Sequence, residues 1–97
     1  MGKVMSQARA RIVISGKVQG VYFRARTQEQ AFALKVMGWV KNSTGGTVEG
    51  VFEGNRENVE KLIDWCRQGP PKAVVSGVQV EWEDYRGEFS SFVIAYR

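Results

Sequence analysis

The chain has 97 residues, of which 43% are hydrophobic and 25% are charged, so it can form one compact domain with a single core. It contains no histidine and one cysteine, Cys66, which excludes histidine-dependent catalysis, an intramolecular disulfide and almost all zinc sites. No apolar stretch is long enough to span a bilayer, and the first residues lack the apolar core of a signal peptide. We therefore expect a cytoplasmic protein with one domain over residues 1–97, of which residues 1–7 form a flexible segment.

The net charge of +4 is unevenly distributed along the sequence. Residues 1–48 hold eight basic residues and one acidic residue, whereas residues 49–97 hold six basic and nine acidic residues. A positive first half favours an anionic ligand, either a nucleic acid or a small phosphate compound. The alternative interpretation is that these basic side chains only solvate one face of the protein.

Two predicted elements flank a glycine-containing loop near the start of the chain. Residues 8–15 place alanine or isoleucine at every second position, which predicts a strand with one buried face. From Phe23 onward, apolar and small residues recur every three or four positions, which predicts an amphipathic helix. We expect this helix to end near Gly38.

A hairpin and a second helix are predicted in the middle of the chain. Residues 39–42 and 48–53 read as strands, and the Ser-Thr-Gly-Gly sequence at 43–46 is typical of a turn between antiparallel neighbours. Asn55 is a favourable N-cap for a helix whose apolar residues recur at i, i+3, i+4 and i+7. Gly69, followed by two prolines, predicts where that helix ends.

Residues 73–82 and 89–96 are the last strand candidates. The order is strand, helix, strand, strand, helix, strand, with a short extra strand at the C-terminal end. This order predicts an α+β fold, the ferredoxin-like sandwich, with a mostly antiparallel sheet and two helices on one face. The fold hosts enzymes, regulatory modules and RNA-binding domains, so it does not decide the function by itself.

The loop between the first strand and the first helix has the sequence GKVQGVYFR at residues 16–24 and contains no nucleophile or acid–base residue. It enters the N-terminus of a helix, where backbone N–H groups lack partners and the dipole is positive. The amides from Gln19 to Phe23 could therefore converge on one phosphate, with Arg24 adding a charged fork. The alternative is an ordinary turn with a surface arginine.

Other residue types in the chain give no competing catalytic centre. Glu49 and Glu53 lie two apart on one predicted strand, and Glu81 and Glu83 lie two apart on another. We expect each pair on a solvated strand face rather than in a paired acid site. Cys66, on the apolar face of the second helix, is expected to be a buried small hydrophobic residue.

Several segments of the chain resemble the acylphosphatase family. They are GKVQGVYFR, GWVKN at 38–42, GTVEG at 46–50 and WCRQGPPKAVV at 65–75, in this order. The similarity extends from about Ala8 to Ile94. It implies a small ferredoxin-like enzyme that hydrolyses the carboxyl–phosphate bond of acyl phosphates without a metal or a cofactor.

The resemblance also implies roles for individual residues. Arg24 matches the arginine that binds the phosphoryl group, and Asn42 matches the asparagine that positions the attacking water. The phosphate-binding loop would consist of Gln19, Gly20, Val21, Tyr22 and Phe23. The implied ligands are a small acyl phosphate and inorganic phosphate or similar anions, with no nucleic-acid or membrane partner, and the implied state is a monomer. From the residues alone, an asparagine before Ser-Thr-Gly-Gly is also ordinary turn chemistry.

Two positions depart from the family pattern. Tyr22 stands where bacterial-type sequences often have glycine, and Gly45 stands where the turn often has aspartate. Tyr22 either stacks on an aromatic acyl group or is a partly buried ring without a ligand role. The alternative function is a non-catalytic ferredoxin-like module that binds anions or nucleic acid. A calculated pI near 9.5 suggests this alternative. Against nucleic-acid binding, residues 48–53 hold one aromatic residue, whereas a platform that stacks bases needs several.

Overall fold

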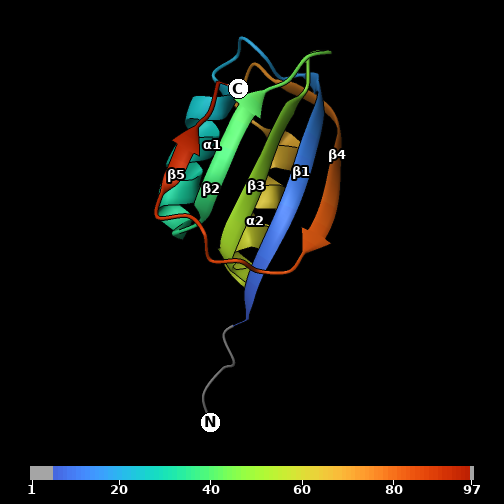
Figure 1. Ribbon diagram of the computed structural model, residues 1–97. Coiled ribbons are helices and arrows are strands. Elements are labelled where there is room, and N and C mark those ends of the chain that lie inside the picture. Colours follow the sequence, from blue (N-terminus) through green and yellow to red (C-terminus); the bar gives the residue numbers. More distant parts are fainter. Residues whose placement is uncertain (1–5, 97) are drawn as a thin grey trace.

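The computed structural model describes residues 6–96, which form a five-stranded sheet with two helices packed on one face (Figure 1). The elements in chain order are β1 (Gln7–Lys17), α1 (Phe23–Leu34), β2 (Met37–Asn42), β3 (Val48–Asn55), α2 (Arg56–Gln68), β4 (Val74–Glu83) and β5 (Phe92–Ile94). Most of the expected flexible segment 1–7 lies outside the described residues, and Gln7 is the first residue of β1. Neither helix in the described part of the chain is long and apolar enough to cross a membrane.

The sheet has the strand order β4-β1-β3-β2-β5. β1 pairs antiparallel with both β3 and β4, and β2 pairs antiparallel with β3. The short β5 adds to the outer edge of β2 in parallel. The predicted ferredoxin-like α+β fold, with its hairpin and its extra C-terminal strand, is confirmed.

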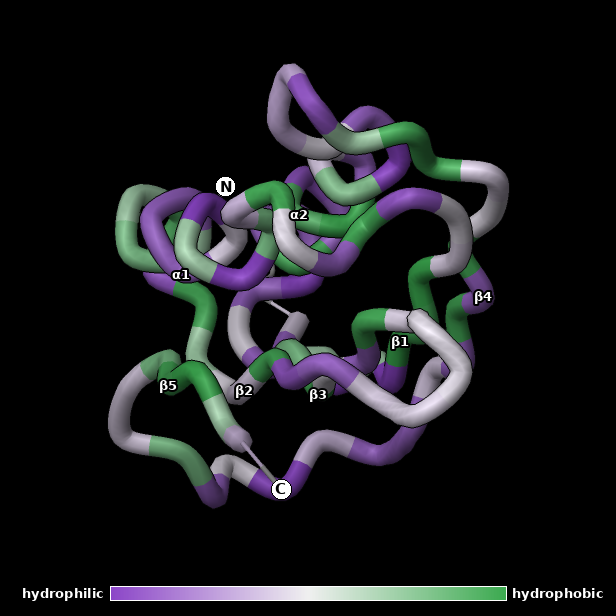
Figure 2. Tube along the Cα trace, turned by 90° about the horizontal axis from the view of Figure 1, so that it is seen from above, coloured by the Kyte–Doolittle hydropathy of each residue, from purple (hydrophilic) through white to green (hydrophobic). Residues whose placement is uncertain are grey.

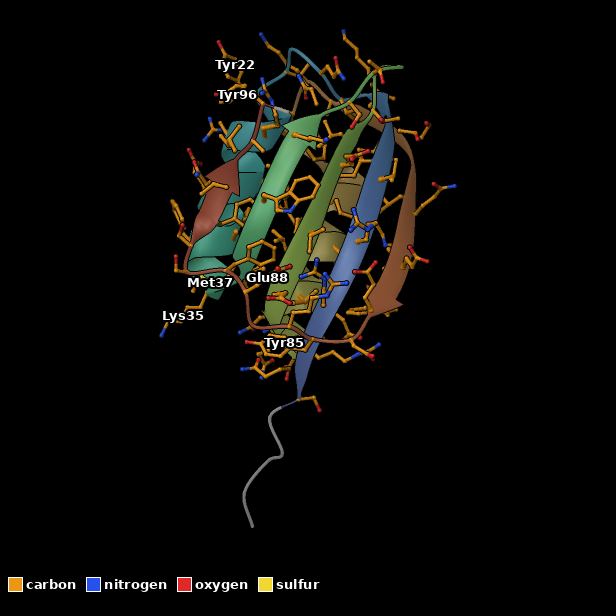
Figure 3. All side chains as sticks on the ribbon, in the orientation of Figure 1. Tyr22, Lys35, Met37, Tyr85, Glu88 and Tyr96 are labelled. Atoms are coloured by element: carbon orange, nitrogen blue, oxygen red, sulfur yellow. The ribbon has the colours of Figure 1, made fainter. Side chains whose placement is uncertain are left out.

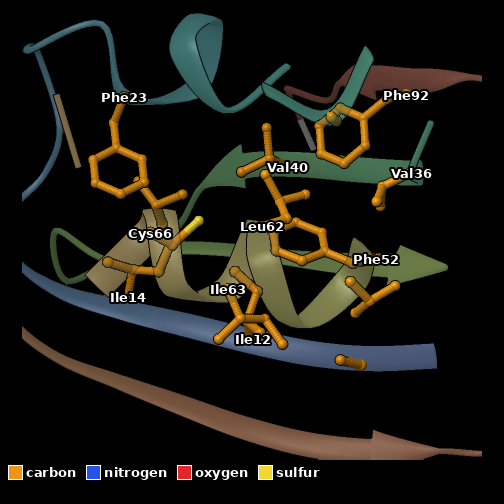
Figure 4. Close-up of a cluster of buried hydrophobic side chains, with 14 of the residues drawn as sticks. Ile12, Ile14, Phe23, Val36, Val40, Phe52, Leu62, Ile63, Cys66 and Phe92 are labelled. Carbon is orange, nitrogen blue, oxygen red and sulfur yellow. The ribbon is translucent and has the colours of Figure 1, made fainter. Parts of the chain in front are cut away.

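The hydrophobic core lies between the sheet and the helices. The predicted inward residues of β1 are fully buried, and they face side chains from both helices and from the neighbouring strands (Figure 4). Seen from above, the two helices lie on one side of the sheet, and the segment between β4 and β5 crosses its other side (Figure 2). Cys66 is buried in this core as expected, and burial raises the pKa of its thiol to about 12.

The first helix ends earlier than the sequence predicted. α1 ends at Leu34 because Lys35 adopts a left-handed conformation, with φ 58°, that closes the last turn. Gly38, expected near the helix end, instead lies inside β2 with φ 138°. A side chain there would put its Cβ 1.9 Å from the carbonyl oxygen of Val51 on β3. This glycine permits close approach of two strands and does not stop the helix.

Other boundaries differ by a few residues. β3 continues two residues beyond the predicted end, to Asn55, and β5 is confined to Phe92–Ile94 instead of 89–96. The N-cap prediction for α2 is confirmed, because the Asn55 side chain accepts hydrogen bonds from the amides of Glu57 and Asn58.

A buried ion pair on the sheet face opposite the helices corrects one sequence expectation. Glu53 is not on a solvated strand face: its side chain is 2% exposed, and Arg9 Nη1 on β1 donates to its Oε2 at 3.1 Å. Arg9 also donates to Glu83 at 2.9 Å and to Glu88 at 2.6 Å. This basic residue of the first half is therefore neutralised and does not add to a positive surface.

The same carboxylate holds the segment that crosses the sheet between β4 and β5. The backbone amides of Arg86, Gly87 and Glu88 all donate to the two oxygens of Glu53, and the ring of Phe89 lies 5.5 Å from the Arg9 guanidinium carbon. Burial acts to raise the pKa of the Glu53 carboxyl, but the donated hydrogen bonds together lower it below its ordinary value. Glu53 is thus an ionised anchor for the crossing segment.

Replacing this anchor should destabilise the fold. We expect Glu53→Gln to lower the free energy of unfolding by on the order of 3 kcal/mol, because it leaves the buried Arg9 with one partner fewer and weakens three amide contacts. Urea unfolding followed by circular dichroism measures the change. The matched control is Glu49→Gln, which removes only a partly exposed pair with Lys41 at 3.7 Å and should cost less than about 1 kcal/mol. Equal losses in the two variants would contradict the anchor role.

The lowered carboxyl pKa values predict loss of stability in acid. Arg9 and Arg11 lower the pKa of Glu83, as the contacts above lower that of Glu53. The stabilisation is therefore present above the unfolded glutamate pKa of about 4.3 and is lost as the pH falls through the lower folded values. We expect the free energy of unfolding to decrease below about pH 4. Urea titrations at several pH values measure the free energy of unfolding, and in Glu53→Gln it should decrease less steeply with falling pH than in the wild type. The same pH dependence in both proteins would contradict this role of Glu53.

Candidate functional site

The loop after β1 has an unusual backbone conformation at the start of α1. Gly20 has φ 74°, and Tyr22, the N-cap residue, has φ 64° and ψ 22° in the left-handed region. Val18, Val21 and Phe23 are buried, and they anchor the loop to the core while the residues between them remain accessible. These three buried apolar side chains therefore fix the loop against the core.

The backbone amides of this loop have no acceptor in the part of the chain that the structure describes. Within residues 6–96, none of the N–H groups from Gln19 to Phe23 donates a hydrogen bond to another protein group. The N-cap Tyr22 makes no side-chain capping bond, and the first turn of α1 holds no acidic residue. A helix N-terminus without caps or acids offers unpaired donors and the positive end of the dipole to an anion.

Gln19 ties this loop to the turn between β2 and β3. Its side-chain Nε2 donates to the carbonyl oxygens of Ser43 and Thr47, both at 2.9 Å. The sequence predicts only a backbone role for Gln19, so this side-chain contact was not expected. No sequence signal identifies it, because the two acceptors are backbone atoms 24 and 28 residues away.

Asn42 is the last residue of β2, directly before that turn. Its Oδ1 atom is buried and has no hydrogen-bond partner in the described part of the chain, and the same holds for Ser43 Oγ. A buried amide oxygen without a donor is costly. Asn42 can therefore accept a hydrogen bond from a water or a ligand atom that enters this end of the fold.

Arg24, in the first turn of α1, has no carboxylate partner among the described residues. Arg26, two residues further along the helix, pairs with Glu29 at 3.0 Å. In the described structure the Arg24 guanidinium lies over the ring of Tyr96, whose centre is 5.4 Å from its carbon atom. Its charge is therefore available to an anionic ligand.

The structure brings the two predicted segments to one end of the sheet. The loop after β1 and the β2–β3 turn lie together there, opposite the end crossed by the Glu53-anchored segment (Figure 1). The arrangement combines unpaired amides, a guanidinium group and an amide side chain, which suits a phosphate and a water molecule. No group of three or more potential metal ligands occurs within residues 6–96.

Several known proteins with similar sequences and structures are acylphosphatases. A family model described as Acylphosphatase matches residues 10–94. An acylphosphatase of Pelotomaculum thermopropionicum is 70% identical and covers 95% of this chain and 100% of its own. A solved acylphosphatase from Coxiella burnetii has the same fold, with 38% identity and a TM-score of 0.87 over 92% of this chain and 93% of that one. A solved acylphosphatase from Bacillus subtilis also has this fold, with 32% identity and a TM-score of 0.88 over 92% of this chain and 99% of that one. With the family model spanning nearly the whole sheet and both helices, the chain belongs to the acylphosphatase family.

Proposed function

We propose that this acylphosphatase hydrolyses the carboxyl–phosphate bond of a small acyl phosphate by in-line attack of water, releasing a carboxylate and inorganic phosphate. The observation that carries the mechanism is the group of amides at the start of α1 that have no acceptor within residues 6–96, beside an arginine with no carboxylate partner in the same range. The proposed setting is the cytoplasm, and the proposed active unit is a monomer.

The phosphoryl group is bound by the loop. Its oxygens accept hydrogen bonds from the backbone amides of the phosphate-binding loop, Gln19, Gly20, Val21, Tyr22 and Phe23. Arg24 donates from the adjacent turn of α1, where no carboxylate of residues 6–96 pairs with it. These donors stay in place during the reaction, so they stabilise the charge that moves onto the phosphoryl oxygens in the transition state.

Asn42 positions the attacking water. Its buried Oδ1 atom lacks a donor, and a water molecule supplies one while its own lone pair remains directed at phosphorus. The side-chain contacts of Gln19 hold the turn that follows Asn42 against the loop. The water and the phosphoryl group are thereby kept in a fixed relation, which is the main requirement of a loose phosphoryl-transfer transition state.

The reaction as proposed needs no side-chain acid or base. The leaving group is a carboxylate, the conjugate base of a fairly strong acid, so it departs without protonation. A phosphoryl oxygen of the substrate takes the proton of the attacking water. This account agrees with a chain that has no histidine.

Removing either proposed catalytic residue should abolish most of the activity. We expect Arg24→Ala and Asn42→Ala each to lower kcat/KM by about 10²–10³-fold, the usual effect of losing one transition-state donor or positioning group. Phosphate release from benzoyl phosphate is the measurement. The matched controls are Arg26→Ala, whose arginine already pairs with Glu29, and Asn58→Ala on α2. Full activity of Arg24→Ala, or a similar loss of activity in Arg26→Ala, would refute the role proposed for Arg24. Phosphate binding by the wild type without hydrolysis of benzoyl phosphate would indicate the non-catalytic alternative.

Gln19 should act as a positioning residue. We expect Gln19→Ala to lower the free energy of unfolding by about 1–3 kcal/mol through the loss of two hydrogen bonds. It should also reduce kcat more than the affinity for inorganic phosphate, because the backbone amides of the loop remain. Steady-state kinetics and phosphate inhibition constants test this split. A fall in phosphate affinity with unchanged kcat would contradict it.

A further inference from the structure

Tyr22 occupies a position that neither packing nor capping explains. Its backbone is left-handed, with φ 64°, which costs free energy for any residue that carries a Cβ. Its side chain is 77% exposed, so the partly buried ring considered from the sequence is wrong. In the described structure the ring makes no hydrogen bond or aromatic contact that would offset the strain.

Tyr96 presents a second exposed ring at the same end of the molecule. Its ring lies 5.4 Å from the Arg24 guanidinium carbon and is 79% exposed. The preceding amide, that of Ala95, donates to the carbonyl of Val40 at 2.8 Å, which extends the pairing of β5 with β2. Residues 92–95 are thereby held alongside β2, the strand that carries Asn42.

Both rings lie beside the proposed phosphate site. Tyr22 lies two residues before Arg24, and Tyr96 contacts the Arg24 guanidinium. Figure 3 shows both tyrosines beside the start of α1, far from Tyr85 at the opposite end of the sheet. They are the two most exposed large hydrophobic side chains in the described structure, and both occur at this site.

We propose that Tyr22 and Tyr96 select the acyl part of the substrate and favour acyl phosphates with an aromatic or other flat unsaturated acyl group over short aliphatic ones. The inference rests on the proposed hydrolysis. The loop and Arg24 occupy the phosphoryl oxygens, so the acyl group extends out of the loop toward its rim. A flat apolar group there packs on the exposed rings, whereas an acetyl group is too small to reach both.

The test compares kcat/KM for benzoyl phosphate with kcat/KM for acetyl phosphate. The ratio of the two cancels any change in phosphate binding that both substrates share. We expect Tyr22→Gly and Tyr96→Ala each to lower this ratio about two- to tenfold, chiefly through KM for benzoyl phosphate. Tyr22→Phe and Tyr96→Phe keep the rings and should keep the ratio.

Tyr85→Ala is the matched control, because it removes an exposed tyrosine from the far end of the sheet. Its ratio should equal that of the wild type. Tyr22→Gly introduces a residue that adopts the observed left-handed backbone without strain, so a folding defect does not obscure the result for this variant. An unchanged ratio in both ring-deleting variants, or an equal fall in Tyr85→Ala, overturns this inference alone. Failure of the wild type to release phosphate from either substrate overturns the proposed function with it.

Discussion

Two hydrogen bonds from one side chain join the parts of the proposed active site. The Gln19 amide donates to Ser43 and Thr47, and through them it links the loop that enters α1 with the turn that leaves β2. Neither segment holds the other by backbone pairing, since the loop lies outside the sheet and β2 pairs with β3 and β5. The relation between Arg24 and Asn42 therefore depends on a contact between neutral groups, which uses none of the charged side chains at this end.

Arginines in this chain meet two opposite environments. Arg9 is buried against three carboxylates at one end of the sheet, where it stabilises the segment between β4 and β5. Arg24, at the other end, has no carboxylate partner in the described residues. The acidic residues of the second half thus neutralise the structural Arg9, whereas within residues 6–96 none of them pairs with Arg24, the arginine proposed to bind phosphate. The ion pairs of Arg9 hold the segment between β4 and β5. The charge of Arg24 would instead interact with the phosphoryl group of the proposed substrate.

Local patterns in the sequence predicted most of the fold, and contacts between distant residues account for the rest. Periodicity identified the helices and strands, and the Asn55 cap was readable because its acceptor and donors are neighbours. Gly38 was misread as a helix stop because its reason, the Val51 carbonyl on β3, is remote in sequence. Glu53 was misplaced because alternation along one strand does not reveal a segment folded over it. The loop sequence and the family resemblance suggested the proposed site. The hydrogen bonds of the Gln19 side chain could not be predicted, because their acceptors are backbone atoms 24 and 28 residues away.

The parallel pairing of β5 with β2 has a practical consequence for handling the protein. Because Ala95 bonds to Val40 and Tyr96 contacts Arg24, the described part of the chain ends beside the proposed phosphate site. An affinity tag or a fluorescent protein attached there would compete with substrate for that space. The start of β1 lies at the far end of the sheet (Figure 1), so the amino terminus is the better point of attachment for kinetic work.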